Sequence, residues 1–378
     1  MKQSPPRVKR PELPALTGVR AIAAAMVVIS HIRLPQNAPT WAVHVAESGY
    51  IGVPLFFILS GVVLAYNYGH INPRSAREVW NFYVARGARI LPLYYAVLIY
   101  LAIRREALGY EQLYFWRHVF NIQTWTGSLL AAQQTYNGPA WSINVELFFY
   151  ALFPLLMPLF VALSKRFGVR GLASVIVVIA AIQWALCFWF FAAGWADLPA
   201  ADPASGHRWL YRHPVPRLLE FGMGIALAQI LEHRPFERLT DRFHTLIQVA
   251  AIAFASIVTV ARPWDGPTAG LWRVASFGAL YSIPFILLLW SLASGRGLVA
   301  RFLSTAPLRS LGVSSFALYL THRPFLEVLG ADVVRESNNL AGWLLVLALL
   351  GFTMVIGEGA HRYIERPCHK LLIKLQRR

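Results

Sequence analysis

Ten long apolar runs dominate this sequence and restrict it to one class of fold. Each is long enough, or nearly so, to cross a bilayer as a helix, which takes about 20 apolar residues. A hydrophobic content of 57% with only 14% charged residues leaves too little polar surface for a soluble chain of 378 residues. We expect an all-α, polytopic membrane bundle of about ten helices. The predicted spans are 15–33, 50–68, 89–103, 141–163, 172–195, 216–231, 246–262, 272–293, 311–330 and 340–360.

The distribution of basic residues predicts how the bundle sits in the membrane. With the N-terminus in the cytoplasm, most of the 35 Lys and Arg side chains fall in the tails and in cytoplasmic loops, as the positive-inside rule requires. We expect both termini in the cytoplasm, a basic tail at 1–14, one membrane domain at 15–363 and a second basic tail at 364–378. Topology and attraction to membrane lipid then explain the net charge of +17, and no nucleic-acid partner is expected.

Within the first run, the stretch Leu16–Ile32 contains only two side chains that can carry a charge, Arg20 and His31. On a continuous helix, this spacing brings the two side chains to one face, about 20° apart and about 16 Å apart along the axis. Polar groups in hydrocarbon are costly unless they face the bundle interior, so the pair indicates a functional site. The alternative is an arginine that reaches to the membrane edge and a histidine that bonds a nearby carbonyl for packing.

Two further pairs of polar residues interrupt the apolar background. Arg86 and Arg89 lie three positions apart, so a helix would place them together against one polyanion, although such a pair is also a common anchor at the membrane surface. Ser142 and Glu146 share a helix face at a separation of four. The carboxylate must be protonated, face a polar cavity or pair with an arginine such as Arg20.

A polar stripe follows the ninth run, where Ser315, Tyr319 and His322 recur at helical spacing. We expect Tyr319 and His322 to contact a substrate. Because His322 falls near the predicted non-cytoplasmic end, a solvated histidine at the membrane edge is the simpler alternative.

Signatures of soluble enzymes are missing from the sequence. It has no Walker A loop, no G-x-S-x-G turn and no H-E-x-x-H motif. Gly222 and Gly224 form half of a dinucleotide pattern but follow no strand, so we expect them to permit close packing of helices. Cys187 and Cys368 fall at different levels of the predicted bundle, and no Cys/His metal spacing accompanies them. We therefore expect no disulfide and no metal.

Taken in order along the chain, these motifs resemble the acyltransferase-3 family. The resemblance rests on Arg20 and His31 with ten residues between them, the pair Arg86 and Arg89, and four segments: GVPLFFILSG, PAWSINVE, SFALYLTHRP and YIERP around Glu365. Members of that family are membrane proteins that O-acylate extracytoplasmic glycans, lipids or small molecules with cytoplasmic acyl-CoA. The resemblance implies that His31 is the essential first-helix histidine and that Arg86 and Arg89 bind CoA.

The same resemblance bears on the end of the chain. Some members of the family carry an additional C-terminal domain with the SGNH hydrolase fold, which completes the transfer. No such domain follows the last predicted span here. We therefore expect the final transfer to occur in the membrane domain or on a separate periplasmic transferase.

The polar residues suggest how such a transfer would proceed. A thioester is already activated, so the enzyme must place the acyl carbon beside an acceptor hydroxyl and remove the hydroxyl proton. A neutral His31 suits the role of general base, because imidazole exchanges protons near neutral pH. Glu146 would orient His31 or pair with Arg20. We expect the remaining candidates to contact the acceptor: Ser142, Tyr319 and His322.

These expectations define an O-acyltransferase of the inner membrane. It would move an acyl group, most simply acetyl, from cytoplasmic acyl-CoA to a hydroxyl of an extracytoplasmic glycan or glycolipid. A transporter of an anionic solute or acyl group would use the same buried Arg, His and Glu without chemistry, although no inverted repeat of the kind common in transporters is evident. A scaffold in a polysaccharide export complex would not need His31. Consumption of acyl-CoA in the presence of a glycan acceptor separates the catalyst from the transporter.

Overall fold

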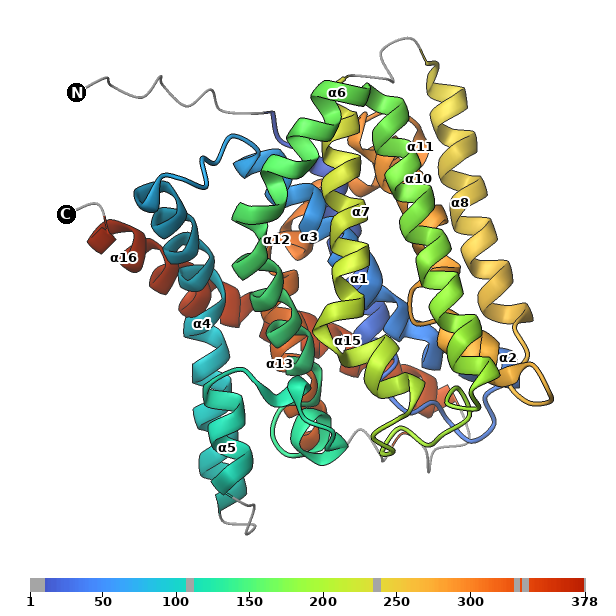
Figure 1. Cartoon of the computed structure of the whole chain (residues 1–378). Coiled ribbons are helices and arrows are strands. Elements are labelled where there is room, and N and C mark those ends of the chain that lie inside the picture. Colours follow the sequence, from blue (N-terminus) through green and yellow to red (C-terminus); the bar gives the residue numbers. More distant parts are fainter. Residues whose placement is uncertain (1–10, 107–111, 234–238, 330–333, 335–339, 377–378) are drawn as a thin grey trace.

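The computed structural model describes residues 11–106, 112–233, 239–329, 334 and 340–376, and every regular element in these ranges is a helix (Figure 1). The prediction of an all-α chain is confirmed for these residues. The α-helices are α1 (Pro14–Ile29), α2 (Thr40–Glu47), α3 (Gly52–Tyr68), α4 (Ala76–Glu106), α5 (Gln112–Val119), α6 (Trp141–Ala192), α7 (Pro214–Glu232), α8 (Asp241–Ala261), α9 (Ala269–Ala275), α10 (Ala279–Ala293), α11 (Leu298–Leu303), α12 (Ala306–Val313), α13 (Ser315–Val328), α15 (Leu340–Ala360) and α16 (Arg366–Gln376). Short 3-10 and π-helices connect them: η1 (Ser48–Ile51), η2 (Gln123–Trp125), η3 (Leu130–Gln134), η4 (Gly138–Ala140), η5 (His207–Arg212) and η6 (His361–Glu365).

The ten predicted spans all overlap helices, and two of them, 141–163 and 172–195, overlap the single helix α6. This helix is 52 residues long and bends at Gly168, whose φ of 58° lies in the left-handed region that glycine adopts without strain. Figure 1 shows α6 turning back at that bend, with α7 between its two halves. Among the described residues, six helices are long and apolar enough to cross a membrane. The count of ten crossings therefore stays a prediction.

Both described ends of the chain lie on one side of the bundle. The hydroxyl of Tyr66, near the end of α3, donates to the Pro11 carbonyl at 2.9 Å. The Gln376 side-chain amide donates to Asn81 Oδ1, in the first turns of α4, at 2.6 Å. Because only residues 69–75 separate α3 from α4, these two contacts place the ends together. The arrangement is the one that the predicted topology requires, and the assignment of this side to the cytoplasm remains a prediction.

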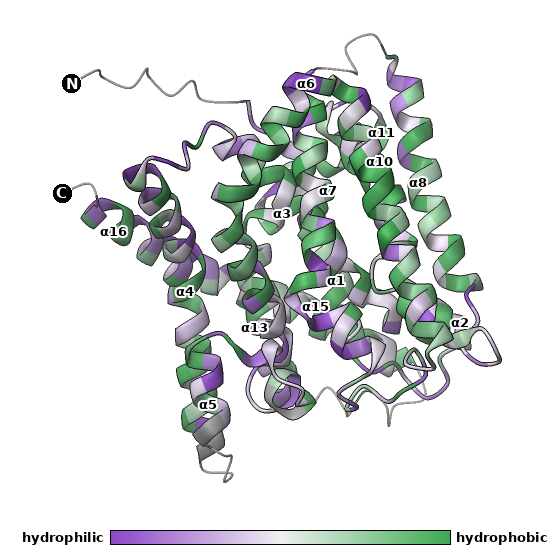
Figure 2. Ribbon diagram, viewed as in Figure 1, coloured by the Kyte–Doolittle hydropathy of each residue, from purple (hydrophilic) through white to green (hydrophobic). Residues whose placement is uncertain are grey.

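The predicted C-terminal tail, 364–378, is mostly ordered helix. The structure describes it as far as residue 376, and α16 packs against α4. Leu371 and Leu375 are exposed on the same helix as Lys370 and Lys374, and Figure 2 shows hydrophobic and hydrophilic residues mixed along α16. This is the pattern of an amphipathic helix at a membrane surface. The sequence analysis overlooked this helix because the segment is too short to span a membrane.

Close packing between α3 and α7 fixes the centre of the bundle. A Cβ atom added at Gly224 would lie 2.9 Å from the Cα atom of Gly61 and would collide with the carbonyl oxygen of Ile58. At Gly222 the nearest atom would be 3.6 Å away, in the Ile179 side chain, which is an ordinary contact. The predicted role of glycine in close helix packing is therefore confirmed for Gly224 and is wrong for Gly222.

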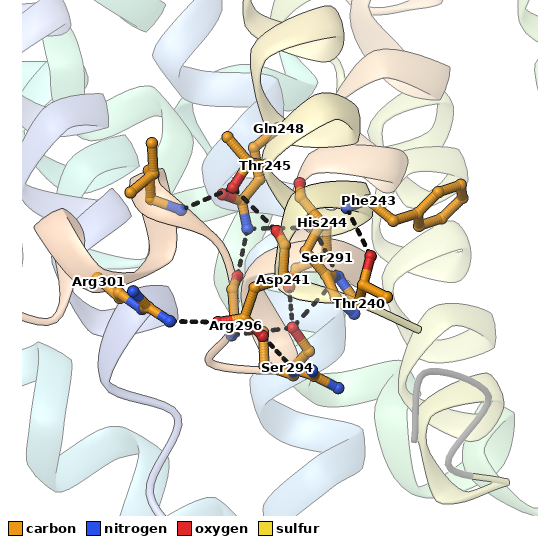
Figure 3. Close-up of polar contacts among 11 residues, drawn as sticks. Thr240, Asp241, Phe243, His244, Thr245, Gln248, Ser291, Ser294, Arg296 and Arg301 are labelled. Carbon is orange, nitrogen blue, oxygen red and sulfur yellow. Dashed lines mark hydrogen bonds and ion pairs between the residues drawn. The ribbon is translucent and has the colours of Figure 1, made fainter. Parts of the chain in front are cut away.

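A polar cluster fixes α8 against α10 and α11, as Figure 3 shows. Asp241, the first residue of α8, accepts a hydrogen bond from Arg296 Nε at 2.6 Å and a second from Arg301. Gln248 Oε1 accepts from the backbone N–H groups of Val299 and Ala300 at 3.1 and 3.3 Å, in the first turn of α11. The cluster joins α8 to α10 and α11, and α11 in turn packs against α1.

Candidate functional site

Most of the predicted site residues meet at one cavity, which we call the inner cavity. Five helices line it: α1, α3, α4, α6 and α13. Six of the eight predicted residues are among the lining side chains: Arg20, Arg86, Arg89, Ser142, Glu146 and Tyr319. The other two, His31 and His322, do not line it.

A second and larger cavity adjoins the inner one. This cavity, which we call the vestibule, lies between the ends of α1, α3 and α4 and the segments α12, α15 and η6. Its lining includes Pro11 and Tyr66, so it lies on the side of the bundle where the described ends meet. Arg20, Arg86 and Arg89 line both cavities. The three arginines therefore stand at the junction between the two.

The junction arginines carry their charge without a paired carboxylate. In the part of the chain that the structure describes, none of the three forms an ion pair within 4 Å. Arg86 donates to the Tyr68 hydroxyl at 3.0 Å, but its buried Nε has no partner among the described residues. Buried polar atoms nearly always have a partner in folded proteins. The junction is thus suited to an anionic ligand that accepts hydrogen bonds.

The third predicted span, 89–103, begins too late. Arg86 and Arg89 lie within α4, a continuous helix of 31 residues, rather than ahead of a membrane helix. The polar residues near the start of α4 lower its hydropathy, which hid the true beginning of the helix.

Glu146 is held by hydroxyl groups in the inner cavity. Its Oε1 accepts from the Tyr150 hydroxyl at 2.5 Å and from Ser60 Oγ at 3.3 Å. Arg20 lines the same cavity but forms no ion pair with it in the described structure. The expectation that Glu146 orients His31 finds no support in these contacts. The sequence analysis missed Tyr150, although a separation of four on one helix signals such a pair.

Tyr319 closes the inner cavity on the side of the histidines. Its hydroxyl accepts from Ser142 Oγ at 2.8 Å and donates to the Pro139 carbonyl at 3.0 Å. Its ring makes a T-shaped contact with the His322 ring, with centroids 5.8 Å apart. Ser142 and Tyr319, both predicted to bind substrate, therefore bond each other at the boundary between the cavity and the histidines.

His31 lies in the turn that follows α1, two residues beyond the end of the helix, so the predicted span 15–33 is too long. The Val27 carbonyl accepts from Ser30 Oγ and contacts His31 Nδ1, each at 2.8 Å. The His31 backbone N–H bonds the Val28 carbonyl instead, at 3.0 Å. Side chains thus replace the backbone hydrogen bond that would have continued the helix, and the ideal helical geometry between Arg20 and His31 does not hold.

His31 and His322 contact each other. His322 Nε2 lies 3.4 Å from His31 Nδ1, and the ring centroids are 4.9 Å apart. His322 Nδ1 lies 2.6 Å from the Tyr319 carbonyl. Because carbonyl oxygens only accept, each neutral ring carries its hydrogen on Nδ1, which leaves the Nε2 of His31 with a lone pair that has no partner among the described residues. His322 is 0% exposed, so the alternative of a solvated histidine is wrong.

The described residues offer arginines rather than metal ligands. No three His, Cys, Asp or Glu side chains lie together in this part of the chain as ligands of one metal ion would. A reaction without a metal stays a prediction.

Comparisons with known proteins agree with the geometry. The model of an acyltransferase domain matches residues 13–357. The chain is 29% identical to the acyltransferase MdmB of Streptomyces mycarofaciens, with 97% of this chain and 94% of the relative covered. It is 22% identical to the peptidoglycan O-acetyltransferase OatA of Listeria monocytogenes and 23% identical to the O-acetyltransferase OatA of Staphylococcus aureus. These matches cover 96% and 95% of this chain, which spans just over half of each relative, 57% in both cases.

No solved structure matches this chain. The chain therefore belongs to the acyltransferase-3 family and is a membrane acyltransferase.

Proposed function

We propose that the protein transfers an acyl group, most simply acetyl, from acyl-CoA in the cytoplasm to a hydroxyl of a glycan or glycolipid outside it. The observation that carries this proposal is the junction of the two cavities, where Arg20, Arg86 and Arg89 have no paired carboxylate among the described residues. CoA is a polyanion with a long, thin arm. Its phosphates match the arginines, and its arm matches a cavity that leads inward between helices.

The inner cavity would receive the pantetheine arm and the thioester. Ser315 Oγ is buried, lines this cavity and has no partner among the described residues. Together with Arg86 Nε, it offers a hydrogen to an acceptor atom of the ligand. The amide and thioester carbonyls of the donor are such acceptors.

The chemical step uses the free lone pair of His31. Nε2 takes the proton of the acceptor hydroxyl as its oxygen attacks the thioester carbonyl. The tetrahedral intermediate then collapses, the carbon–sulfur bond breaks and CoA leaves as a thiolate, which recovers a proton from the imidazolium. The product is an ester, and no covalent acyl-enzyme is required.

His322 supports this step through His31. When His31 Nε2 takes the proton, the positive charge is shared with its Nδ1–H, which points at the Val27 carbonyl and at His322 Nε2. A neutral His322, whose own Nδ1–H is held by the Tyr319 carbonyl, stabilises that charge. His322 is then a positioning residue, whereas the sequence analysis expected it to bind the substrate.

The acyl group must pass Tyr319 to reach His31. Phe56 and Tyr319 line the inner cavity, and their rings pack together with centroids 6.0 Å apart. Beyond Tyr319 lie the two histidines. The proposal therefore includes a movement of the Tyr319 ring away from Ser142 and Pro139 when the donor is bound.

The acceptor class is inferred from the relatives. The Listeria protein is named a peptidoglycan O-acetyltransferase, which supports a glycan acceptor. The Streptomyces relative, which matches this chain over nearly its whole length, is named only as an acyltransferase. That name favours no acceptor class, and a small secreted molecule, which the family resemblance also allows, is the second candidate.

Complementation of a deletion strain tests the proposal. Cells that lack the protein are complemented with the wild type, with His31→Ala or with the control His233→Ala. His233 follows the end of α7 and lines neither cavity. We expect mass spectrometry of envelope glycans and secreted molecules to show an O-acetyl group with the wild type and the control but not with His31→Ala. General-base removal costs about 10²- to 10⁴-fold in rate.

A purified preparation separates catalysis from transport. Wild-type protein in vesicles that contain an envelope glycan extract should release free CoA thiol from acetyl-CoA. His31→Ala protein should bind acetyl-CoA but release no thiol. Passage of intact acetyl-CoA across the vesicle membrane with no thiol release would contradict the proposal and favour a transporter.

A further inference from the structure

The vestibule is more basic than a single pair of donor-binding residues requires. Six arginines and two glutamates are among its lining residues. Three of the arginines stand at the junction with the inner cavity. The other three line the vestibule but not the inner cavity, and we call them the outer arginines: Arg309, Arg362 and Arg366.

The outer arginines lie on the C-terminal part of the chain. Arg309 is on α12, Arg362 is on η6 and Arg366 begins α16. Both η6 and α16 contact α4, so the segment that carries two outer arginines packs against the helix that carries Arg86 and Arg89. Arg362 and Arg366 also follow residue 357, where the match to the family model ends.

Two of the outer arginines are paired with carboxylates, one exposed and one half-buried. Arg309 lies 3.1 Å from Glu12, and Arg362 lies 3.1 Å from Glu358. The arginine side chains are 45% and 62% exposed, respectively. Ion pairs at such exposure contribute little free energy, so these guanidinium groups remain available to a more highly charged ligand. Arg366 forms no ion pair within the described residues.

The charge of the vestibule matches the nucleotide end of CoA. Besides its pyrophosphate, CoA carries a phosphate monoester on the 3′ oxygen of the ribose, which adds about −1.5 to −2 charge near neutral pH. This phosphate is on the nucleotide, at the far end of the molecule from the thioester. If the thioester lies in the inner cavity and the pyrophosphate at Arg86 and Arg89, the 3′-phosphate falls in the outer part of the vestibule.

We infer that the outer arginines bind the 3′-phosphate of the CoA donor. The inference rests on the proposed function, because it assumes that acyl-CoA is the donor. Guanidinium groups bind phosphate through paired N–H groups, which suits them to this role better than lysine. The site then selects the complete coenzyme over precursors that lack the 3′-phosphate.

Isothermal titration of the purified full-length protein with CoA and with 3′-dephospho-CoA tests the inference without an acceptor. The wild type should bind CoA about tenfold more tightly than 3′-dephospho-CoA, since a charged hydrogen bond changes affinity by about tenfold to a hundredfold and exposure reduces the effect. The double variant Arg362→Ala/Arg366→Ala should lose that difference. Its affinity for CoA should fall about tenfold, and its affinity for 3′-dephospho-CoA should not change.

Arg301→Ala is a matched control. Its side chain is 64% exposed and pairs with Asp241, as Arg362 pairs with Glu358, but it lines neither cavity. We expect this variant to keep the tenfold preference for CoA. Arg309→Ala provides a second probe on a different helix, and we expect it to reduce the preference as well.

The outcomes separate the two proposals. Equal loss of affinity for both ligands in the double variant would overturn the inference, because the arginines would then act only through their general charge. An unchanged preference for CoA in the double variant and in Arg309→Ala would also overturn it. If neither ligand binds the wild type, the proposed function itself fails.

Discussion

His322 Nε2 lies 3.4 Å from His31 Nδ1, although 291 positions separate the two residues in the sequence. Each ring is also held by a backbone carbonyl of its own segment, Val27 for His31 and Tyr319 for His322. Two imidazoles anchored from different helices thus fix the direction in which the free Nε2 of His31 points. A lone histidine in a turn would have no such second anchor.

A change at His322 should slow the reaction without weakening substrate binding. His322→Ala removes the group that faces the Nδ1–H of His31, so we expect kcat to fall about tenfold or more, with KM for donor and acceptor nearly unchanged. His322→Asn keeps a hydrogen-bond acceptor and should retain more activity than alanine. Initial rates with varied donor and acceptor provide the measurement. A raised acceptor KM at normal kcat would instead restore the substrate-binding role expected from the sequence.

The gathering of most site residues could be predicted from the sequence, because one local rule governs it. A polar side chain on an apolar helix is stable only when it faces the bundle interior. Arg20, Glu146 and Tyr319 obey this rule on three different helices and meet at one cavity. The rule states which face is buried. It does not state which partner a side chain finds there.

The parts that the sequence could not predict depend on competing local bonds or on distant partners. Ser30 and His31 take over the Val27 carbonyl and end α1 early, although the apolar run continues. The contact between His31 and His322 joins segments from opposite ends of the chain, and no periodicity encodes it. The helix α16 was hidden because an amphipathic surface helix carries no long apolar run, and its basic residues were interpreted as a cytoplasmic tail.

Glu146→Gln tests whether the carboxylate acts by charge or by shape. Glutamine keeps an oxygen that can accept from Tyr150 and Ser60 but removes the possible negative charge. If the charge is coupled to Arg20 across the inner cavity, activity should fall about tenfold before the melting temperature changes. Ser60→Ala, which removes only the longer bond, is the control and should have a smaller effect. Parallel losses of activity and thermal stability would indicate a packing role.

Glycine at 224 should be much less tolerant of substitution than glycine at 222. Gly224→Ala places a methyl group against Gly61 and the Ile58 carbonyl, so we expect a loss of about 1–3 kcal/mol in the free energy of unfolding. Gly222→Ala meets only ordinary contacts and should stay within about 0.5 kcal/mol of the wild type. Thermal unfolding in one detergent compares the two variants. Equal effects would contradict the close approach of α3 and α7.

Reporter fusions test the ten predicted crossings. Ser164, after the fourth predicted span, contacts His233, after the sixth, at 3.0 Å, so the two loops share a side. Arg262, the last residue of the seventh span, donates to Tyr50, the first residue of the second span, at 2.6 Å. Fusions after Gln36 and Asp265 should therefore report the extracytoplasmic side, and fusions after Arg166 and Arg378 the cytoplasm. A cytoplasmic signal at Asp265 would contradict the count of ten.

Arg86 and Arg89 should govern the affinity for the donor and leave the acceptor untouched. Arg86 is anchored by Tyr68, whose hydroxyl it contacts at 3.0 Å, and its Nε has no partner within the described residues. Removal of a charged hydrogen bond costs about 1.5–3 kcal/mol. We therefore expect Arg86→Ala or Arg89→Ala to raise the Kd for CoA about tenfold to a hundredfold.

Two further measurements separate specific recognition of the donor phosphates from general charge. Lysine keeps the charge but not the paired N–H groups, so Arg86→Lys and Arg89→Lys should lose only part of the affinity. Salt should weaken binding to the wild type more than to the double alanine variant, because fewer charged contacts remain to be screened. Tyr68→Phe removes only the anchor of Arg86 and should produce a small loss. An unchanged Kd for CoA in the double alanine variant would show that the donor binds elsewhere, since no other arginine except Arg20 lines both cavities in the described structure.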